Sequence, residues 1–215
     1  VVHGGGPQIA EKLKNKNIDS KFIEGLRVTD KDTVKVVEDV LANEINAEIV
    51  KSINESGGKA IGLSGNKNTL LSATKLKIEV KDSDSNIEKL VDIGFVGQPT
   101  KVNINFIKKH IKDGKIPVIA PLGIDDEGNS YNINADTAAG FIAGKLEASK
   151  LLLLTDVPGI LDQDKKLISS LTLDDASKII DEDFIVGGMK PKILTCIEAM
   201  KKGVNKTTIL DGRIP

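Results

Sequence analysis

The sequence predicts an α/β fold: an open, mainly parallel sheet sandwiched between helices, with a β-hairpin as a lid. Three observations support this prediction. Short apolar runs alternate along the chain with longer segments of helical periodicity. Glycine or proline follows several of these runs, where a strand would turn into a helix. No internal repeat or low-complexity linker interrupts the alternation, which is typical of parallel strands joined by helical crossovers.

The bulk composition is that of a soluble globular protein and argues against several functions. The chain has 215 residues, of which 40% are hydrophobic and 28% charged, with a net charge of −1. This balance provides no basic surface for nucleic acid or a membrane. No apolar run is long enough to span a bilayer, and a single cysteine indicates a reducing compartment. We therefore expect a cytoplasmic protein with one domain over residues 1–215.

The chain opens with a predicted strand, a glycine turn and a helix. Val1 and Val2 lead into Gly4-Gly5-Gly6, and Pro7 begins a helix that ends near Asn15. Glycines leave backbone N–H groups uncovered at the positive end of a helix, which suits a phosphate or a carboxylate. The alternative is a turn that merely needs positive φ angles. Neither a Walker A loop nor a G-x-G-x-x-G motif is present.

A strand or hairpin is expected over residues 22–28, and it carries Arg27 between apolar residues. A planar guanidinium suits a carboxylate held by two parallel hydrogen bonds, and a surface arginine is the alternative. A long helix is predicted from Asp30 to Glu55, with a capping box at its start. Its apolar positions recur at helical spacing: Val34, Val37, Leu41, Ile45 and Ile49.

The middle of the chain contains two buried strands, a hairpin and a helix. Residues 60–63 and 116–120 are short apolar runs, typical of buried parallel strands. Residues 76–80 and 91–97 are predicted to form the hairpin, laid over the main sheet. A helix is expected over residues 101–112.

Three small polar residues, Asn132, Asn134 and Asp136, come at two-residue intervals before a predicted helix over residues 137–146. One of them must cap this helix. Contact with a ligand, or an aspartate that orders lysines and metal-bound waters, would account for the other two. Just before them, the acidic stretch 125–128 lacks the ligand spacing of a calcium loop. We favour a hairpin turn there and predict no metal site in the protein itself.

The last third of the chain returns to the strand–helix alternation. Residues 150–156 are a leucine-rich run that ends in Thr-Asp, the profile of a central parallel strand. Residues 157–161 turn away from its carboxyl end, which is where open α/β sheets bind ligands. A helix is expected over residues 174–181 and a final strand over 206–210.

The helix predicted over residues 189–202 starts with two lysines, Lys190 and Lys192, directly after two glycines. Lysines in a first helical turn oppose the helix macrodipole. Their presence beside glycines therefore suggests a site for a polyanion such as a nucleotide phosphate. Ordinary surface lysines are the alternative.

Taken together, these motifs resemble those of the amino acid kinase family. They are Val-His-Gly-Gly-Gly-Pro, Gly-Leu-Arg-Val-Thr, Asn-Ile-Asn-Ala-Asp-Thr-Ala-Ala, Thr-Asp-Val-Pro-Gly-Ile-Leu and Gly-Gly-Met-Lys-Pro-Lys, in this order. The likeness runs from Val1 to Pro215. It points to the members that phosphorylate the γ-carboxylate of N-acetyl-L-glutamate with MgATP, the second step of arginine synthesis. The alternatives are a family member acting on aspartate, carbamate, UMP or glutamate, or a non-catalytic regulatory domain that binds an amino acid.

The resemblance implies a substrate-binding part over about residues 1–130. Gly5 and Gly6 would bind the substrate and the transferring phosphoryl group through their N–H groups. Arg27 would hold the α-carboxylate of the substrate. Asn132 would also contact the substrate, and we expect the same of Asn134.

The resemblance also implies a nucleotide-binding part over about residues 131–215. Asp136 would organise the catalytic lysines, and Lys192 would stabilise charge on the transferring phosphoryl group. With Gly5, these two are the expected catalytic residues. The residues expected to border the nucleotide are Asp156, Val157, Gly159, Ile160, Leu161, Phe184, Val186 and Lys192. Magnesium would arrive with ATP rather than in a site of the protein.

One family feature is missing from the sequence. Members carry a strand near the N-terminus with a lysine and two glycines, and that lysine touches the transferring phosphoryl group. We therefore expect a chain truncated at both ends, with turnover lowered by several orders of magnitude. The ending 209–213 resembles members that arginine inhibits and that form hexamers. The resemblance thus implies a homodimer core, a homohexamer in the complete protein, arginine feedback and a PII-type protein as a candidate regulator.

Overall fold

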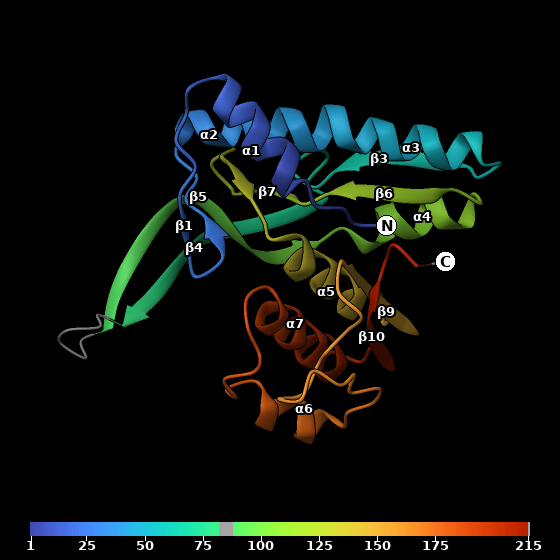
Figure 1. Cartoon of the computed structure of the whole chain (residues 1–215). Helices are drawn as coiled ribbons and strands as arrows, with labels where there is room; N and C mark the ends of the chain where they lie inside the picture. The colour runs from blue at the N-terminus through green and yellow to red at the C-terminus, as the bar shows by residue number, and fades with distance from the viewer. Residues whose placement is uncertain (82–87, 215) are drawn as a thin grey trace. The chain divides into compact units, whose positions relative to one another are not determined.

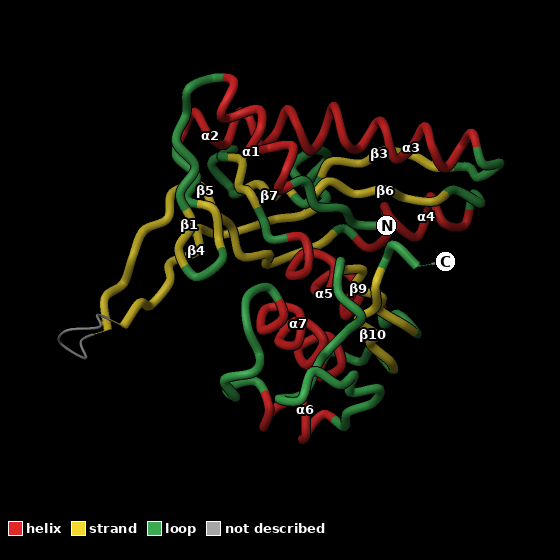
Figure 2. The backbone as a smooth tube through the Cα atoms, in the orientation of Figure 1, coloured by secondary structure: helices red, strands yellow, loops and turns green. Residues whose placement is uncertain are grey.

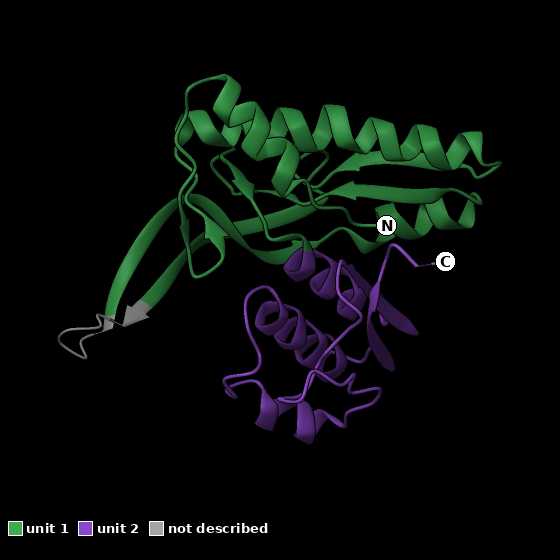
Figure 3. Ribbon diagram, in the orientation of Figure 1, with its two compact units in different colours: residues 1–135 green, residues 136–215 purple. Residues whose placement is uncertain are grey.

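The computed structural model describes residues 1–81 and 88–214. The chain divides into two compact units between Ala135 and Asp136 (Figure 3). Each unit contains a two-stranded parallel sheet with helices packed against it (Figure 1). The predicted α/β class is confirmed, although the parallel strands form a pair in each unit.

The parallel pair of unit 1 consists of β3 (Ala60–Ser64) and β6 (Ile116–Ala120). Val2 adds a parallel bridge to Ile119 on β6, so the glycine turn follows a short extended segment beside this pair. The helices α3 (Asn46–Glu55) and α4 (Ile104–Lys112) pack against the pair.

Residues 31–55 form one continuous helix with three parts. These are α2 (Lys31–Glu38), the π-helix η1 (Asp39–Ile45) and α3. Asp30 caps the helix by accepting hydrogen bonds from the backbone N–H groups of Asp32 and Thr33. The predicted long helix is confirmed, but its π-helical centre was not predicted. The apolar positions 37, 41, 45 and 49 recur every four residues, which is longer than the 3.6 of an α-helix and suits a wider winding.

The core of unit 1 packs α1 (Gly6–Asn15) against the long helix and the start of β7 (Leu122–Ile124). Its buried members are Ile9, Leu13, Val36, Val37, Val40, Leu41, Ile45, Ala120 and Leu122. Fully burying one such aliphatic side chain contributes about 1.5–3 kcal/mol. Because α1 begins at Gly6, this core also holds the glycine turn in place.

The other strands of unit 1 form two antiparallel hairpins and a small mixed barrel. The first hairpin joins β1 (Phe22–Ile23) to β2 (Leu26–Arg27), as predicted. The second joins β4 (Leu71–Lys81) to β5 (Glu88–Val102), and its arms extend away from the rest of unit 1 (Figure 2). These two strands close a barrel with β7 and with β8 (Ser130–Asn132).

The predicted hairpin is therefore confirmed as a strand pair, with strands longer than the sequence indicated, but its arms extend away from the rest of unit 1 (Figure 2) and its role as a lid stays a prediction. Part of the predicted 81–86 loop lies outside the described residues. The helix predicted from Lys101 begins at Ile104 instead, because β5 continues to Val102. Asn103 then caps the helix by accepting a hydrogen bond from the N–H of Phe106. The acidic stretch 125–128 forms the predicted turn between β7 and β8.

Unit 2 contains three helices and one parallel strand pair in its described part. α5 (Ala135–Leu146) begins at the division, and α6 (Leu173–Ile179) and α7 (Met189–Lys201) follow. β9 (Lys150–Thr155) pairs in parallel with β10 (Lys206–Asp211). A buried cluster joins α5, α7 and β9; its members are Ala143, Leu151, Leu153, Ala199 and Val204.

The prediction that residues 150–156 form a central strand is wrong. In the described part of the chain, β9 pairs with β10 alone. Its side chains alternate, with Leu151 and Leu153 buried, while Leu152 and Leu154 are 57% and 61% exposed. Helices of unit 2 cover only one face of this strand, so an unbroken leucine run does not require burial on both faces.

Candidate functional site

The glycine turn leaves backbone N–H groups without a side-chain cap at the start of α1. Gly5 is the N-cap residue, and no side chain in the described part of the chain accepts a hydrogen bond from this end of the helix. The first N–H groups of a helix have no partner within it, and they carry the positive end of the helix dipole. Pro7 follows in the first turn, where its missing N–H costs nothing.

The three glycines are not needed for positive φ angles, so that alternative is wrong. None of them is among the residues with positive φ. A Cβ at Gly5 would collide with the side chain of Ile45 and lie 2.8 Å from Leu41 Cδ2. A Cβ at Gly6 would meet nothing within 4 Å. Gly5 therefore permits a close approach to η1, whereas Gly6 leaves open space at the helix start.

Arg27 is buried, with only 7% of its surface exposed, so the surface alternative is also wrong. Its Nη2 donates to the carbonyl of Gly6 at 3.0 Å, its Nη1 donates to Ser20 Oγ, and its guanidinium lies over the ring of Phe22. Among the side chains that the structure describes, Arg27 forms no ion pair with an acidic residue. Burial lowers the pKa of the guanidinium, yet arginine stays charged.

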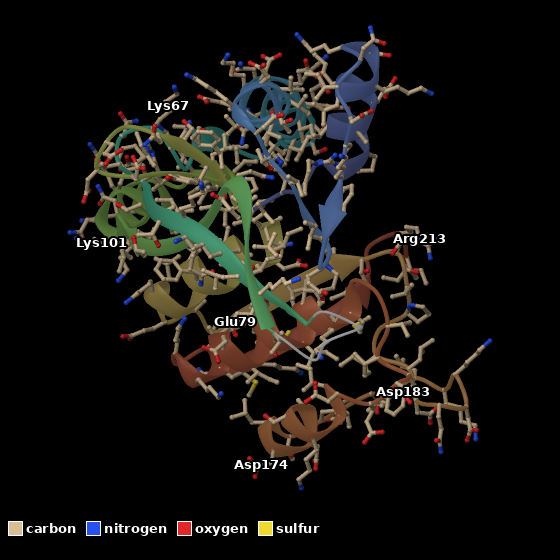
Figure 4. The ribbon with its side chains drawn as sticks, turned by 90° about the vertical axis from the view of Figure 1, so that its left-hand side faces the viewer. Lys67, Glu79, Lys101, Asp174, Asp183 and Arg213 are labelled. Atoms are coloured by element: carbon tan, nitrogen blue, oxygen red, sulfur yellow. The ribbon has the colours of Figure 1, made fainter. Side chains whose placement is uncertain are left out.

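A buried cation without an anionic partner is expensive for a protein unless a ligand supplies the anion. The charged side chains labelled in Figure 4, among them Lys67, Asp174 and Arg213, lie at the surface instead. Arg213, the second arginine of the chain, is paired with Asp211 at 2.7 Å. The contrast makes Arg27 the best candidate for holding a carboxylate in unit 1.

Asn132 is connected to Arg27 through Thr29. Its Nδ2 lies 3.5 Å from Thr29 Oγ1, which donates to the backbone carbonyl of Arg27 at 2.8 Å. Thr29 is fully buried and was not predicted as a site residue. The signal was available, since Thr29 and Arg27 are two residues apart in an extended segment and face the same side. Asn134 is half-buried and lies two residues beyond the end of β8.

In unit 2, the structure brings Asp136 and Lys192 together. Lys192 Nζ lies 2.8 Å and 3.0 Å from the two carboxylate oxygens of Asp136, and both side chains are largely covered. They come from the first turns of α5 and α7. A Cβ at Gly140 would lie 2.6 Å from Thr195 Cγ2, so this glycine lets the two helices approach closely.

The two lysines at the start of α7 have different environments. Lys190 pairs with Asp181 at 2.8 Å, and both side chains are well exposed. Such a surface pair contributes about 0–1 kcal/mol. Lys192 has 16% of its side chain exposed. Only Lys192 is therefore held in a defined position beside a carboxylate.

The residues predicted to border a nucleotide lie in unit 2 but do not all gather at one cavity. Gly159 and Ile160 line a cavity of about 610 Å³ bounded by β10, α7 and the segment 167–173. Phe184 is half-buried and packs in a cluster with Ile185 and Ile193. The others are more exposed or do not line this cavity: Asp156, Val157, Leu161 and Val186.

No metal-binding cluster was found in the part of the chain that the structure describes. No three histidine, cysteine, aspartate or glutamate side chains gather there in a way that could hold an ion. In addition, no helix among the described residues is both long and apolar enough to cross a bilayer.

The fold and these residues define an α/β protein suited to anionic ligands, with a buried guanidinium in unit 1 and an ordered lysine in unit 2. The amino acid kinase family matches the chain over residues 1–211. The chain belongs to this family, which confirms the resemblance of its motifs.

Named relatives support the same assignment. The chain is 53% identical over 215 residues to the acetylglutamate kinase of Rhodopseudomonas palustris strain TIE-1, covering 100% of this chain and 72% of that protein. It is 52% identical to the acetylglutamate kinase of Rhodospirillum centenum, covering 100% and 70%.

Solved structures agree on the fold. The crystal structure of smu.665 from Streptococcus mutans UA159 has a TM-score of 0.85 and 31% identity, covering 98% of this chain and 80% of that chain. Carbamate kinase from Giardia lamblia has a TM-score of 0.57 and 15% identity, covering 98% and 78%. At that low identity, the likeness to carbamate kinase shows the fold alone.

Proposed function

We propose that this protein is an acetylglutamate kinase, which transfers the γ-phosphoryl group of ATP to the γ-carboxylate of N-acetyl-L-glutamate. The observation that carries the proposal is the buried Arg27, which has no acidic partner among the described residues. An acceptor with an α-carboxylate supplies that partner. The relatives that are about half identical over the whole chain bear the same name.

Unit 1 binds the acceptor in this proposal. Arg27 holds the α-carboxylate through donors that Gly6 and Ser20 do not occupy, since a guanidinium has five N–H groups. The N–H groups of Gly5 and Gly6 bind the γ-carboxylate and the transferring phosphoryl group. Asn132 and Asn134 complete the substrate contacts.

Unit 2 binds the donor. Lys192 stabilises negative charge on the transferring phosphoryl group, and Asp136 holds the ammonium in position, as their 2.8 Å contact supports. The residues that border the nucleotide are Asp156, Val157, Gly159, Ile160, Leu161, Phe184 and Val186. The two units thus act as one kinase domain in a single reaction.

The reaction needs positioning and positive charge more than proton transfer. A carboxylate oxygen of the acceptor attacks the γ-phosphorus, and the bond to the leaving ADP oxygen breaks. The products are the acyl phosphate and ADP. Because a glutamate side chain is ionised at neutral pH, no general base is required. His3 is not available for that task, since it is buried with contacts at both ring nitrogens.

Magnesium fits this arrangement as a companion of ATP. Mg²⁺ is commonly bound by substrate phosphates with few protein ligands. When bound, the ion neutralises charge on the phosphate oxygens.

Assembly, regulation and location are proposed on the resemblance alone. The resemblance of residues 209–213 to members that arginine inhibits supports a homodimer core, a homohexamer of the complete protein and arginine feedback. A PII-type protein is the proposed regulator, and the cytoplasm is the proposed location.

Calorimetric titration of the protein with N-acetyl-L-glutamate tests the proposed substrate. Free L-glutamate, L-aspartate and UMP are the comparison ligands. We expect selective binding of the acetylated ligand, and its loss in Arg27→Ala. Tighter binding of a comparison ligand would transfer the assignment to another reaction of the family.

A further inference from the structure

His3 is a buried histidine whose two ring nitrogens both have partners. It directly precedes the glycine turn, and only 8% of its surface is exposed. Its Nε2 lies 3.2 Å from Asn46 Nδ2, and its Nδ1 lies 3.0 Å from the carbonyl oxygen of Gly4. Burial lowers the pKa of His3, which favours the neutral ring.

The contacts of Asn46 determine which ring nitrogen carries the proton. Asn46 Nδ2 also lies 2.9 Å from the backbone carbonyl oxygen of Val118 and 3.4 Å from that of Leu63. A carbonyl oxygen only accepts hydrogen bonds, so the atom facing it must be the amide nitrogen. An amide nitrogen does not accept hydrogen bonds, so His3 Nε2, which faces it, carries no proton. In a neutral ring the proton is therefore on Nδ1, which donates to Gly4.

The hydrogen bond to Gly4 fixes the direction of the Gly5 N–H group. The carbonyl of Gly4 and the N–H of Gly5 belong to one trans peptide, and in a planar trans peptide these two groups point in opposite directions. With its oxygen held by His3, this peptide aims its N–H away from the buried ring. No backbone hydrogen bond from the Gly5 N–H occurs among the described residues.

We propose that His3 is a positioning residue, which aims the N–H of Gly5 at the anionic ligand by holding the Gly4 carbonyl. This inference rests on the proposed function, in which that N–H binds the transferring phosphoryl group. Hydrogen-bond donors that are oriented before the ligand arrives give more stabilisation than donors that must turn toward it.

The residues around Asn46 leave room for its side-chain amide beside His3. Asn46 is the first residue after the π-helical turns of η1, and it is buried although polar. A Cβ at Gly62 would collide with its Oδ1, so the absence of a side chain there admits the amide. The same helical segment presents Leu41 and Ile45 to Gly5. One stretch of helix thus supports the turn through both packing and hydrogen bonding.

The test compares His3→Asn with His3→Leu. Both variants lose the contact with Asn46, but an asparagine amide nitrogen is placed like Nδ1 and can still donate to Gly4. We expect His3→Leu to lower kcat about 10- to 100-fold, less than the 10²–10³ for complete removal of a donor. His3→Asn should retain most of the kcat. Equal losses, or no loss, in the two variants would overturn the proposal.

A second measurement does not depend on activity. Nitrogen-15 NMR of the imidazole at neutral pH distinguishes the two tautomers, and the chain has only two histidines. His110→Asn, a variant outside the proposed site, assigns the signals. We expect the Nδ1–H tautomer for His3. The other tautomer, or a charged ring, would contradict the inference even in an active kinase. The expected tautomer without acetylglutamate binding would instead refute the proposed substrate.

Discussion

The two units keep their functional cations in opposite ways. Arg27 of unit 1 is buried with backbone and hydroxyl partners but without an acid among the described residues. Lys192 of unit 2 contacts both oxygens of Asp136. An arginine stays charged in almost any environment, so it can remain buried and charged before a ligand carboxylate binds. A lysine side chain is long and flexible, and contact with a carboxylate holds its ammonium group in place.

The largest effect is expected from Lys192→Ala. Loss of a cation that acts on the transferring group should lower kcat by about 10²–10³ with little change in acceptor affinity. Steady-state kinetics and calorimetry measure the two quantities. Lys190→Ala is the matched control, because it removes a lysine from the same helical turn and only an exposed ion pair. An unchanged kcat in Lys192→Ala would contradict the role of Lys192 in stabilising the transferring phosphoryl group.

Arg27→Lys should produce the next largest effect. A lysine keeps the charge but not the planar fork, and binding of N-acetyl-L-glutamate should weaken by about 1.5–3 kcal/mol, the usual contribution of a charged hydrogen bond. Calorimetric titration measures the change. Arg213→Lys changes an exposed arginine paired with the buried Asp211; it is the control and should bind normally. Equal affinity in Arg27→Lys and the parent would mean that unit 1 has no carboxylate clamp.

Substitutions in the glycine turn distinguish a role in packing from a role in ligand binding. Gly5→Ala forces a methyl group against Ile45 and Leu41, and overpacking of this kind costs about 1–3 kcal/mol of unfolding free energy. Gly6→Ala has room for its methyl group and should leave the unfolding free energy nearly unchanged while weakening acceptor binding. Urea unfolding followed by circular dichroism, with calorimetry for the ligand, compares the pair. The reverse pattern would contradict the roles given to these glycines.

The smallest effect is expected for Tyr131, whose ionisation reports on unit 1 alone. It is the only tyrosine of a chain without tryptophan, and burial together with its hydrogen bond to Asp125 raises its pKa to about 12. The phenol therefore keeps its proton to higher pH in the folded state than in the unfolded state. Its contribution to the free energy of unfolding is fully present below about pH 10, the pKa of an unfolded tyrosine. This contribution to stability decreases as the pH rises toward 12, the pKa of Tyr131 in the folded protein. In an alkaline titration, phenolate absorbance should appear only well above pH 10. In Asp125→Asn it should appear at a lower pH than in the parent. A phenol that ionises near pH 10 would show that the burial is incomplete.

Local patterns predicted most elements but not the burial of the functional groups. Periodicity was enough for the long helix and for α5, because each covers a core with one apolar face. The environment of Arg27 depends on Ser20, Phe22 and the carbonyl of Gly6, which come from three separate segments. Sequence spacing cannot show such a convergence.

The misassigned strand has a similar cause. The leucines of β9 look alike in sequence, but whether the second face of a strand is covered depends on distant elements. By contrast, the Asp136–Lys192 contact was foreseen through the motifs of the family. Its geometry requires α5 and α7 to meet at Gly140, which no local pattern indicates.

The π-helical turn in η1 makes the length of this helix a constraint that is independent of its composition. One residue of an α-helix corresponds to a rotation of about 100°. The wider winding of η1 already absorbs one residue, so deleting a residue there would leave α3 facing nearly the same way. Inserting a further residue between Asp39 and Ile45 would instead turn α3 about its axis by about 100°. Asn46 would then leave His3, and Ile45 would leave Gly5. Conservative replacements in η1 should therefore be tolerated far better than an insertion of one residue.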